Sequence, residues 1–289
     1  MNDFIQEKLT QYNCKSEQEE EQAIKEIMQE IALFSLSKNG FFKHVAFQGG
    51  TCLRIFHLLS RFSEDLDFAL MKTDLTFDLS KYLSALQKEF SVYDIQMEIQ
   101  NRSHTDMTVK SAFLKATSLG YVLNLKYSQR LNAQNRKLKI KLEVDSNPPD
   151  GATYEVKYHD FPLPYSVNLF DLPSLFAGKL HALLCRNYVK GRDWYDFLWY
   201  IKNRTDINYN LLNSALKQQG AWREQQDLNI DAAWLENSLK EKIRTINWEK
   251  AKTDVASFLN THEQEALVYW TEEMFIAMAD KLFNYSRTV

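Results

Sequence analysis

The stretch FQGGTCLRIFHLLSRFSEDLDFAL, residues 47–70, places two glycines and a threonine before an apolar run and two carboxylates after it. Apolar residues at 44–47 predict a short strand that leads into the stretch. Gly49–Gly50 predicts a turn, and Thr51 is a residue type that caps the start of a helix. Residues 66–70 predict a second strand. The stretch therefore predicts a strand, a turn, a helix and a strand, in that order.

Asp65 and Asp67 stand one residue apart at the start of the second predicted strand. Side chains alternate across a strand, so the two carboxylates project from one face while Leu66 and Phe68 face the core. Two close carboxylates repel each other unless a cation lies between them, and a hard divalent ion such as Mg²⁺ or Mn²⁺ suits oxygen ligands. Taken alone, the pair equally fits a loop followed by an exposed strand.

The glycine end of the stretch has the features of a phosphate site. Gly49 and Gly50 let backbone N–H groups come close to a phosphate, and a helix that begins at Thr51 favours anions. If the two strands are neighbours, the turn and the carboxylates hold a nucleoside triphosphate from both sides. Ser63 adds a hydroxyl just before the carboxylates. A Gly-Gly pair by itself is also a common turn.

The flanking segments extend this pattern. Residues 17–36 show the apolar spacing of a helix after the capping-box pattern of Ser16–Glu19, and Glu19–Glu21 are expected to be a solvated first turn. Lys139–Asp145 alternates cleanly between a charged face and an apolar face. A further helix is expected over residues 77–89, and strands over 92–100, 121–127, 154–158 and 165–170.

The character of the sequence changes after residue 170. Strand-like alternation stops, and helical spacing predicts helices near residues 175–184, 194–201, 234–246 and 267–283. The expected fold class is α+β. Residues 1–170 form a mixed β-sheet with flanking helices, and residues 171–289 form a helical domain.

Composition restricts the class of protein. The 289 residues carry a formal net charge of −3, which argues against a polyanion binder by bulk charge. The three cysteines Cys14, Cys52 and Cys185 are isolated, so neither a disulfide framework nor a zinc site is indicated and a reducing compartment is expected. No secretory signal pattern and no apolar run of membrane-spanning length is present, so we expect a cytoplasmic protein without a membrane partner.

The ordered combination of these motifs resembles the AbiEii/AbiGii toxin family of the nucleotidyltransferase superfamily. That family reads Gly-Gly-Thr-x-Leu-Arg followed by Arg-Phe-Ser-x-Asp-x-Asp-Phe, and both halves occur within residues 49–68. KIKLEVD at 139–145 and GKLHALLCRNYVKGRDWYDFLWY at 178–200 resemble two later family segments. One departure is Gln48, which stands where the family often has Lys, so no role is assigned to a basic residue there. The resemblance covers about residues 40–200.

The resemblance implies a nucleotidyltransferase-like N-terminal fold and metal-dependent transfer of a nucleotide from an NTP. It assigns Asp65 and Asp67 to the metal pair and Glu143 to the third carboxylate, with Asp145 on the same strand face as the alternative. It assigns Gly49, Gly50, Thr51 and Ser63 to the triphosphate, and Lys179 to nucleotide phosphates. Asp193 and Asp196 match the last catalytic motif. On spacing alone, these two fit an exposed helix start paired with Arg192 better than a functional role.

The distribution of charge along the sequence suggests which molecule accepts the nucleotide. Residues 107–142 contain no acidic residue, although the whole chain is acidic. The basic residues of this stretch are Lys110, Lys115, Lys126, Arg130, Arg136, Lys137, Lys139 and Lys141. Phosphate contacts of this kind dominate nucleic-acid affinity, so Lys126, Arg130, Arg136, Lys137, Lys139 and Lys141 are candidates for an RNA patch. Chance clustering on solvated strand ends is the alternative.

Three functions of different classes remain open from the sequence. The first, which the resemblance favours, is a toxin of a type IV-like toxin–antitoxin pair that transfers NMP to the hydroxyl of an RNA such as tRNA and has a cognate antitoxin. The second is nucleotidyl transfer to a small molecule or a protein. The third is a non-catalytic nucleotide-binding module.

Overall fold

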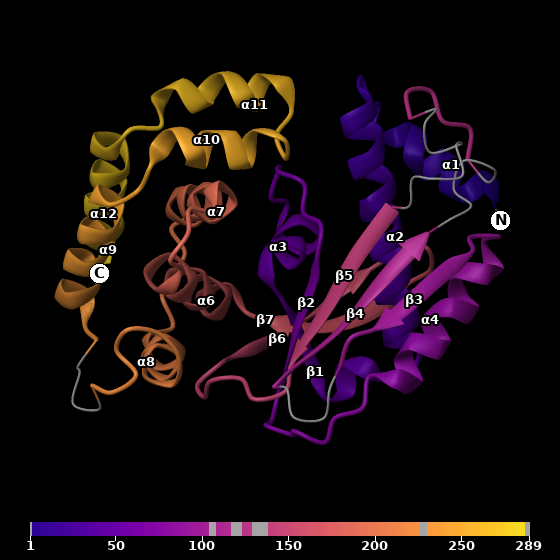
Figure 1. Ribbon diagram of the computed structural model, residues 1–289, viewed down its shortest axis with the longest axis horizontal. Helices are drawn as coiled ribbons and strands as arrows, with labels where there is room; N and C mark the ends of the chain where they lie inside the picture. Colours follow the sequence, from indigo (N-terminus) through magenta and orange to yellow (C-terminus); the bar gives the residue numbers. More distant parts are fainter. Residues whose placement is uncertain (1, 104–107, 117–122, 129–137, 226–229, 287–289) are drawn as a thin grey trace. The chain divides into compact units, whose positions relative to one another are not determined.

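The computed structural model of the protein describes residues 2–103, 108–116, 123–128, 138–225 and 230–286 (Figure 1). Its strands all lie before residue 171, as the sequence predicts. They are β1 (Val45–Gln48), β2 (Leu66–Leu70), β3 (Met97–Asn101), β4 (Val109–Ala116), β5 (Leu138–Asp145), β6 (Tyr154–His159) and β7 (Tyr165–Phe170).

The strands of the described residues form one seven-stranded mixed sheet in the order β3-β4-β5-β2-β1-β7-β6. β1 and β2 are antiparallel neighbours, with Gln48 opposite Asp67. β2 pairs with β5 in parallel, although the two strands are far apart in the sequence. β1, which leads into the glycines, and β2, which carries Asp67, are therefore neighbours near the middle of the sheet, and the triphosphate hypothesis requires that they be neighbours.

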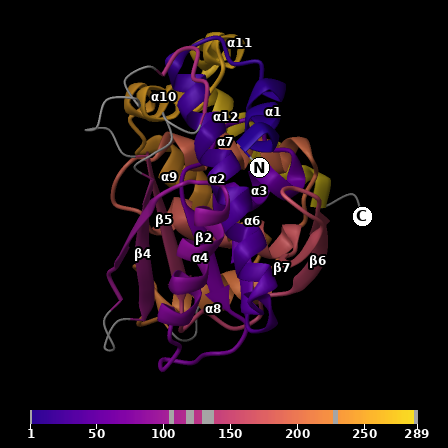
Figure 2. The same ribbon diagram turned by 90° about the vertical axis from the view of Figure 1, so that its right-hand side faces the viewer.

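The helices of this part of the chain are α1 (Asn2–Gln11), α2 (Glu17–Lys38), α3 (Gly49–His57) and α4 (Ser80–Val92), with a 3₁₀ turn η1 (Phe41–Lys43). α2 and α4 pack against each other and against β5 and β3, so they cover one face of the sheet (Figures 1 and 2). Ser16 begins α2, because its hydroxyl accepts a hydrogen bond from the Glu19 N–H. The core between these layers is aromatic, with Phe41 and Phe68 meeting edge to face at a centroid distance of 5.0 Å.

From residue 171 onward, the regular elements of the described residues are all helices, as expected. The elements are α6 (Leu172–Cys185), α7 (Gly191–Lys202), α8 (Tyr209–Gln218), α9 (Ala232–Arg244), α10 (Trp248–Ala256), α11 (Thr261–Glu265), η3 (Ala266–Tyr269) and α12 (Glu272–Ser286). α6 packs on α7, α8 and α9, and α12 packs on α7 and α9. Trp194 of α7, Trp248 of α10 and Phe275 of α12 form the aromatic centre of this bundle.

The chain divides into two compact units. The first comprises residues 1–58, 62–148 and 155–169, and the second comprises residues 59–61, 149–154 and 170–289. The short segment 59–61 thus joins the helical unit, although it lies between α3 and β2 in sequence. Among the described helices, none combines the length and the apolar character needed to cross a bilayer.

Two local predictions were wrong. The part of residues 121–127 that is described, from Leu123, is irregular rather than a strand. Its backbone N–H groups at Lys126, Tyr127 and Ser128 donate instead to the carboxylate of Glu20, at 2.8, 2.9 and 2.6 Å. Glu20 is consequently 4% exposed and is not part of a solvated first turn.

Candidate functional site

Asp67 and Glu143 are direct cross-strand neighbours on β2 and β5. Neighbouring strands lie about 4.8 Å apart, so the two carboxylates leave the sheet side by side. Both are half-buried, whereas Phe68 and Val144, the residues that follow them, are buried on the opposite face. The alternation that the sequence predicted for both strands is confirmed, and it puts two carboxylates together from distant parts of the chain.

Asp145, the alternative third carboxylate, lies two residues farther along β5, opposite Ala69. Burial raises the pKa of this carboxyl, while a hydrogen bond from the Asn147 N–H opposes the rise. The register therefore pairs Asp67 with Glu143 and not with Asp145.

Asp65 lies just before β2 and lines a cavity of ≈340 Å³ together with Lys139 and Lys141 of β5. The Lys141 ammonium is 2.7 Å from the Glu143 carboxylate. The Lys139 ammonium lies 3.5 Å from the centre of the Phe113 ring, which also lines the cavity. Positive charge thus borders the carboxylate group, in line with the predicted basic patch.

The start of α3 lies beside the same carboxylates. Gly49 is its first residue, with φ +80°, and a Cβ there would come within 2.6 Å of the Asp67 Oδ2. Gln48 precedes the helix without a side-chain capping bond, and Gly50 continues it. The backbone N–H groups of this first turn have no intrahelical partner, which favours an anion here.

The prediction that Thr51 caps α3 is wrong. The helix already begins at Gly49, and Thr51 is its third residue. Its side chain is fully buried, and its hydroxyl donates to the backbone oxygen of Asp65. This bond ties α3 to the segment that carries the carboxylates. Ser63 is half-buried in that segment, and its backbone oxygen accepts a hydrogen bond from Gln29 of α2.

Gly49→Ala is expected to reduce nucleotidyl transfer at least about tenfold, because the new methyl group would collide with the Asp67 carboxylate and displace it. The left-handed backbone adds a cost of about 1–2 kcal/mol for any residue with a Cβ. The measurements are NTP turnover and the free energy of unfolding.

Gly178→Ala is the matched control, since a Cβ at Gly178 meets nothing within 4 Å. It lies in α6 and is expected to be neutral or to stabilise by up to about 1 kcal/mol. Full activity of Gly49→Ala would contradict the close approach of α3 to Asp67.

The residues at this site fit a divalent cation in their chemistry. Two carboxylates on adjoining strands are hard oxygen donors, and Lys141 is paired with one of them, Glu143. Within the described residues, no three His, Cys, Asp or Glu side chains already stand together as a metal-binding group. The metal set Asp65, Asp67 and Glu143 stays a prediction, with Asp67 and Glu143 adjoining and Asp65 two residues before Asp67.

The predicted RNA patch is described only in part. Lys139 and Lys141 line the cavity with Asp65, and Lys126 is exposed, with its ammonium 4.9 Å from the centre of the Tyr127 ring. Arg130, Arg136 and Lys137 lie outside the described residues.

Lys179, Asp193 and Asp196 meet in the helical unit in a buried charge network. The Lys179 ammonium is 2.7 Å from Asp193 Oδ1 and 2.7 Å from Asp196 Oδ2. Arg61 completes the network with two bonds of 2.6 Å to the two oxygens of Asp196. Desolvation disfavours the charge on Lys179, yet Asp193 and Asp196 outweigh it and raise the pKa of this ammonium.

The alternative that Asp193 and Asp196 form an exposed helix start is wrong. They are 2% and 0% exposed, and Arg192 approaches Asp254 instead, at 3.8 Å. Arg61 was missed as their partner, although it begins the Arg-Phe-Ser motif of the opening stretch. That motif was the available signal, but nothing local connects it to residues 135 positions later.

The Asp193 carboxylate predicts an acid-sensitive contribution to stability. Burial favours its neutral form, but the charges of Lys179, Lys190 and Arg186 prevail and lower its pKa from 3.8 to about 2. A carboxyl whose pKa is lower in the folded protein than in the unfolded chain stabilises the fold at pH values above its unfolded pKa. Asp193 is therefore expected to contribute roughly 2 kcal/mol to the free energy of unfolding at neutral pH, and this contribution is lost as the pH falls from about 4 to about 2. Urea unfolding of the wild type and Asp193→Asn across this range measures it. Equal pH slopes in the two proteins would contradict it.

Comparison with known proteins supports the assignment that the motifs imply. The family model described as "Nucleotidyl transferase AbiEii toxin, Type IV TA system" matches residues 31–270. No curated protein matches the chain.

Solved structures share the fold at low sequence identity. A putative nucleotidyltransferase from H. pylori is 16% identical with a TM-score of 0.51, over 90% of this chain and 94% of that one. JHP933 from Helicobacter pylori is 16% identical with a TM-score of 0.54, over 92% and 94%. MenT4, the nucleotidyltransferase toxin Rv2826c from Mycobacterium tuberculosis H37Rv, is 14% identical with a TM-score of 0.50, over 99% and 98%. Because the family model matches most of this chain, the chain belongs to the AbiEii family of nucleotidyl transferase toxins of type IV toxin–antitoxin systems.

Proposed function

We propose that this toxin transfers NMP from an NTP to a hydroxyl of RNA in a reaction that depends on Mg²⁺ or Mn²⁺. The observation that carries the proposal is the cross-strand pair of Asp67 and Glu143 beside the glycine start of α3. Carboxylates for a cation and open backbone N–H groups for phosphate oxygens are the two needs of an NTP site.

Each residue of this site has a role that follows from its position. Asp65, Asp67 and Glu143 would hold the cation, which when bound neutralises phosphate charge and favours release of pyrophosphate. The N–H groups of Gly49 and Gly50 bind and orient the triphosphate, with Ser63 as an additional hydroxyl donor. Glu143 accepts the proton of the acceptor hydroxyl at its carboxylate, and the Lys141 ammonium at 2.7 Å orients that carboxylate.

Lys179, Asp193 and Asp196 have a more restricted part in this proposal. A nucleotide phosphate that contacts Lys179 must share its ammonium with the two carboxylates or replace one of them. Their catalytic assignment rests on the resemblance to the family. Their buried ion pairs support a second role, which is to hold α6 and α7 together.

An RNA acceptor is supported by the lysines of the basic stretch near Asp65. Lys139 and Lys141 line it, and Lys126 adds exposed positive charge in the same basic stretch. Ammonium groups of this kind bind phosphodiesters independently of base sequence. A tRNA end is the acceptor that we test first, and a cognate antitoxin is expected from the toxin family.

The direct test incubates the protein with each α-labelled NTP, Mg²⁺ and total cellular RNA. Label in RNA together with pyrophosphate release is expected, and both should disappear with EDTA. Parallel reactions contain small hydroxyl or amine acceptors, or total protein, in place of RNA.

If label is found only in those parallel reactions, the acceptor is not RNA, but the proposal of nucleotidyl transfer stands. Nucleotide binding without pyrophosphate release for all four nucleotides and every acceptor pool would refute catalysis and favour a binding module.

A further inference from the structure

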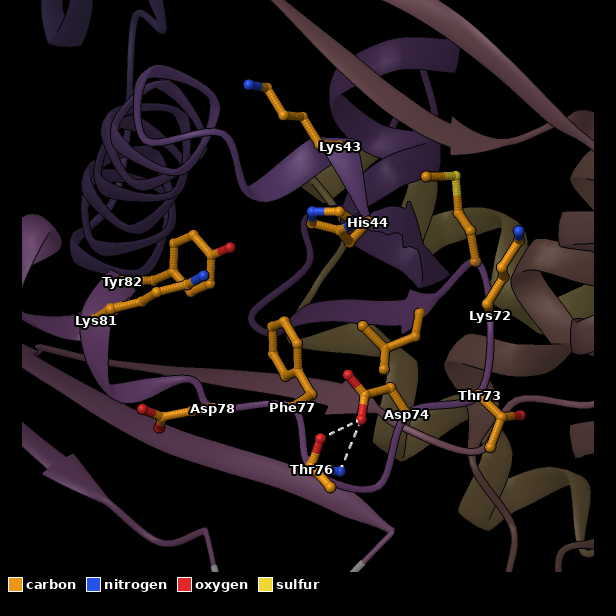
Figure 3. A pocket seen from close by; sticks show the side chains of 12 residues that line it. Lys43, His44, Lys72, Thr73, Asp74, Thr76, Phe77, Asp78, Lys81 and Tyr82 are labelled. Carbon is orange, nitrogen blue, oxygen red and sulfur yellow. Dashed lines mark hydrogen bonds between the residues drawn. The ribbon is translucent and has the colours of Figure 1, made fainter.

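A second cavity, of ≈550 Å³, opens at the end of β1 and β2 that lies away from the carboxylates (Figure 3). In the antiparallel register, Val45 and Leu70 pair at this end, whereas Gln48 and Asp67 pair at the other. Three residues of strand separate the two ends by about 10 Å. All of its lining residues belong to the first compact unit. The cavity is therefore distinct from the candidate active site, and its volume lies within the range of small-molecule sites, about 300–1,000 Å³.

Tyr82 is the residue that points to a ligand. It is 3% exposed, lines the cavity and, among the described residues, its hydroxyl has no hydrogen-bond partner. Figure 3 shows that hydroxyl directed toward the open space between Tyr82, His44 and Phe77. The Tyr82 hydroxyl is open to the solvent of the cavity, whereas those of Tyr12 and Tyr165 are bonded within the protein, to Glu26 at 2.9 Å and to the backbone of Glu30. A ligand acceptor in the cavity would replace water at the Tyr82 hydroxyl.

Cationic groups surround the same space. Lys43, Lys72 and Lys81 line the cavity; within the described part of the chain none of them is at ion-pair distance from a carboxylate, although Lys81 attracts Asp78 electrostatically. The Lys81 ammonium lies over the Tyr82 ring, 4.7 Å from its centre. Three lysines and two aspartates give the lining a net charge of +1 with His44 neutral. An anionic group is the complementary ligand.

The two aspartates are engaged in the loop that forms the cavity wall. Asp74 Oδ1 accepts from the Thr76 N–H at 2.9 Å and from its hydroxyl at 2.5 Å (Figure 3). Asp78 Oδ1 accepts from the Ser80 N–H at 2.9 Å. Each uses one oxygen in these bonds, so the other can accept from a ligand hydroxyl. The lining therefore offers donors for an anion and acceptors for hydroxyl groups.

Phe77 supplies a flat apolar wall. Its ring stacks on Tyr82 with centroids 6.0 Å apart and an angle of 18° between the planes, and it is half-buried at the cavity. An aromatic ring, an anion site and hydroxyl acceptors in one cavity match the base, the phosphate and the ribose of one nucleotide.

We propose that this cavity binds a nucleotide unit, with its phosphate between the Lys81 ammonium and the Tyr82 hydroxyl and its base against Phe77. Lysine binds phosphate as a point charge, and the tyrosine hydroxyl donates a hydrogen bond to a phosphate oxygen. The nucleotide is either free or part of an RNA strand, and the phosphate and base chemistry is the same in both.

The test is titration calorimetry of the full chain with AMP in EDTA, which withholds divalent cations from the carboxylate site. Tyr82→Phe keeps the ring and removes only the hydroxyl, so its melting temperature should not fall, and its AMP dissociation constant is expected to rise about fivefold. Lys81→Ala is expected to raise that constant at least about tenfold. Lys88→Ala is the matched control, because Lys88 is exposed on the same helix α4 and outside the cavity.

Two further ligands, a short RNA and inorganic phosphate, distinguish a free nucleotide from a nucleotide within an RNA strand. If Tyr82→Phe and Lys81→Ala weaken the binding of a short single-stranded RNA more than they weaken the binding of AMP, the nucleotide belongs to an RNA strand. If they weaken AMP binding more, the ligand is a free nucleotide. AMP binding that is unchanged in Tyr82→Phe and Lys81→Ala overturns the proposal, as does no binding at millimolar AMP. Inorganic phosphate that binds as tightly as AMP overturns the nucleotide assignment.

Discussion

Asp67→Asn is expected to reduce nucleotidyl transfer at least about a hundredfold, which corresponds to about 3 kcal/mol of the activation barrier. Asp67 lies directly opposite Glu143 and next to the start of α3, so in the proposed reaction its charge would hold the cation and its position would set the geometry of the phosphate site. A neutral amide of the same shape removes the charge and leaves the packing of β2 intact. Initial rates of label transfer measure the effect, and thermal unfolding checks that the variant is folded.

Asp145→Asn is the matched control for this substitution. It removes a carboxylate from the same face of β5, two residues beyond Glu143, and an asparagine oxygen can still accept from the Asn147 N–H. We expect its activity to stay within a few-fold of the wild type. Wild-type rates in Asp67→Asn would remove the basis of the proposed reaction, and an equal loss in Asp145→Asn would transfer the role of Glu143 to Asp145.

Arg61→Ala is expected to destabilise the protein by about 3–5 kcal/mol, the usual consequence of removing one partner of a buried ion pair. The side chains of Arg61 and Asp196 are 3% and 0% exposed, and two bonds of 2.6 Å join them. Lys179 contacts the same carboxylate but also pairs with Asp193, so it cannot replace both bonds from Arg61. The free energy of unfolding from urea titration at pH 7 measures the loss.

Lys252→Ala serves as the control for Arg61→Ala. Its ion pair with Glu249 is of similar length, 2.7 Å, but Glu249 is 83% exposed, and pairs of this kind contribute about 0–1 kcal/mol. Adding Asp196→Asn to Arg61→Ala removes the unpaired charge and should recover part of the stability. A loss below about 1 kcal/mol in Arg61→Ala would contradict the importance of this buried pair.

Local sequence patterns predicted the elements whose burial alternates regularly. β5 shows this best, because its buried residues are aliphatic and its other face carries Lys139, Lys141 and Glu143. β4 was missed, because its buried positions include Lys110 and two alanines, so its apolar alternation is weak. α4 begins at Ser80, three residues later than predicted, since Asp78 forms a turn that accepts the Ser80 N–H.

Long-range partners could not be predicted from periodicity. The strand expected over 121–127 failed because Glu20, a hundred or so residues earlier, accepts the N–H groups that a neighbouring strand would have used. The helices α8 and α10 were also missed, since each is short and begins with an asparagine cap rather than a long apolar pattern.

The sequence by itself determined that Asp65 and Asp67 stand two residues apart beside a glycine turn, and that Glu143 lies on the charged face of a strand. It also determined the family, through motifs in a matching order. Only the tertiary structure decided that β2 lies beside β5, which brings Asp67 opposite Glu143, and that Arg61 rather than Arg192 neutralises Asp196. The physical reason is that alternation and helical spacing report which face of an element is buried, whereas the partner of a charged side chain depends on which distant elements pack together.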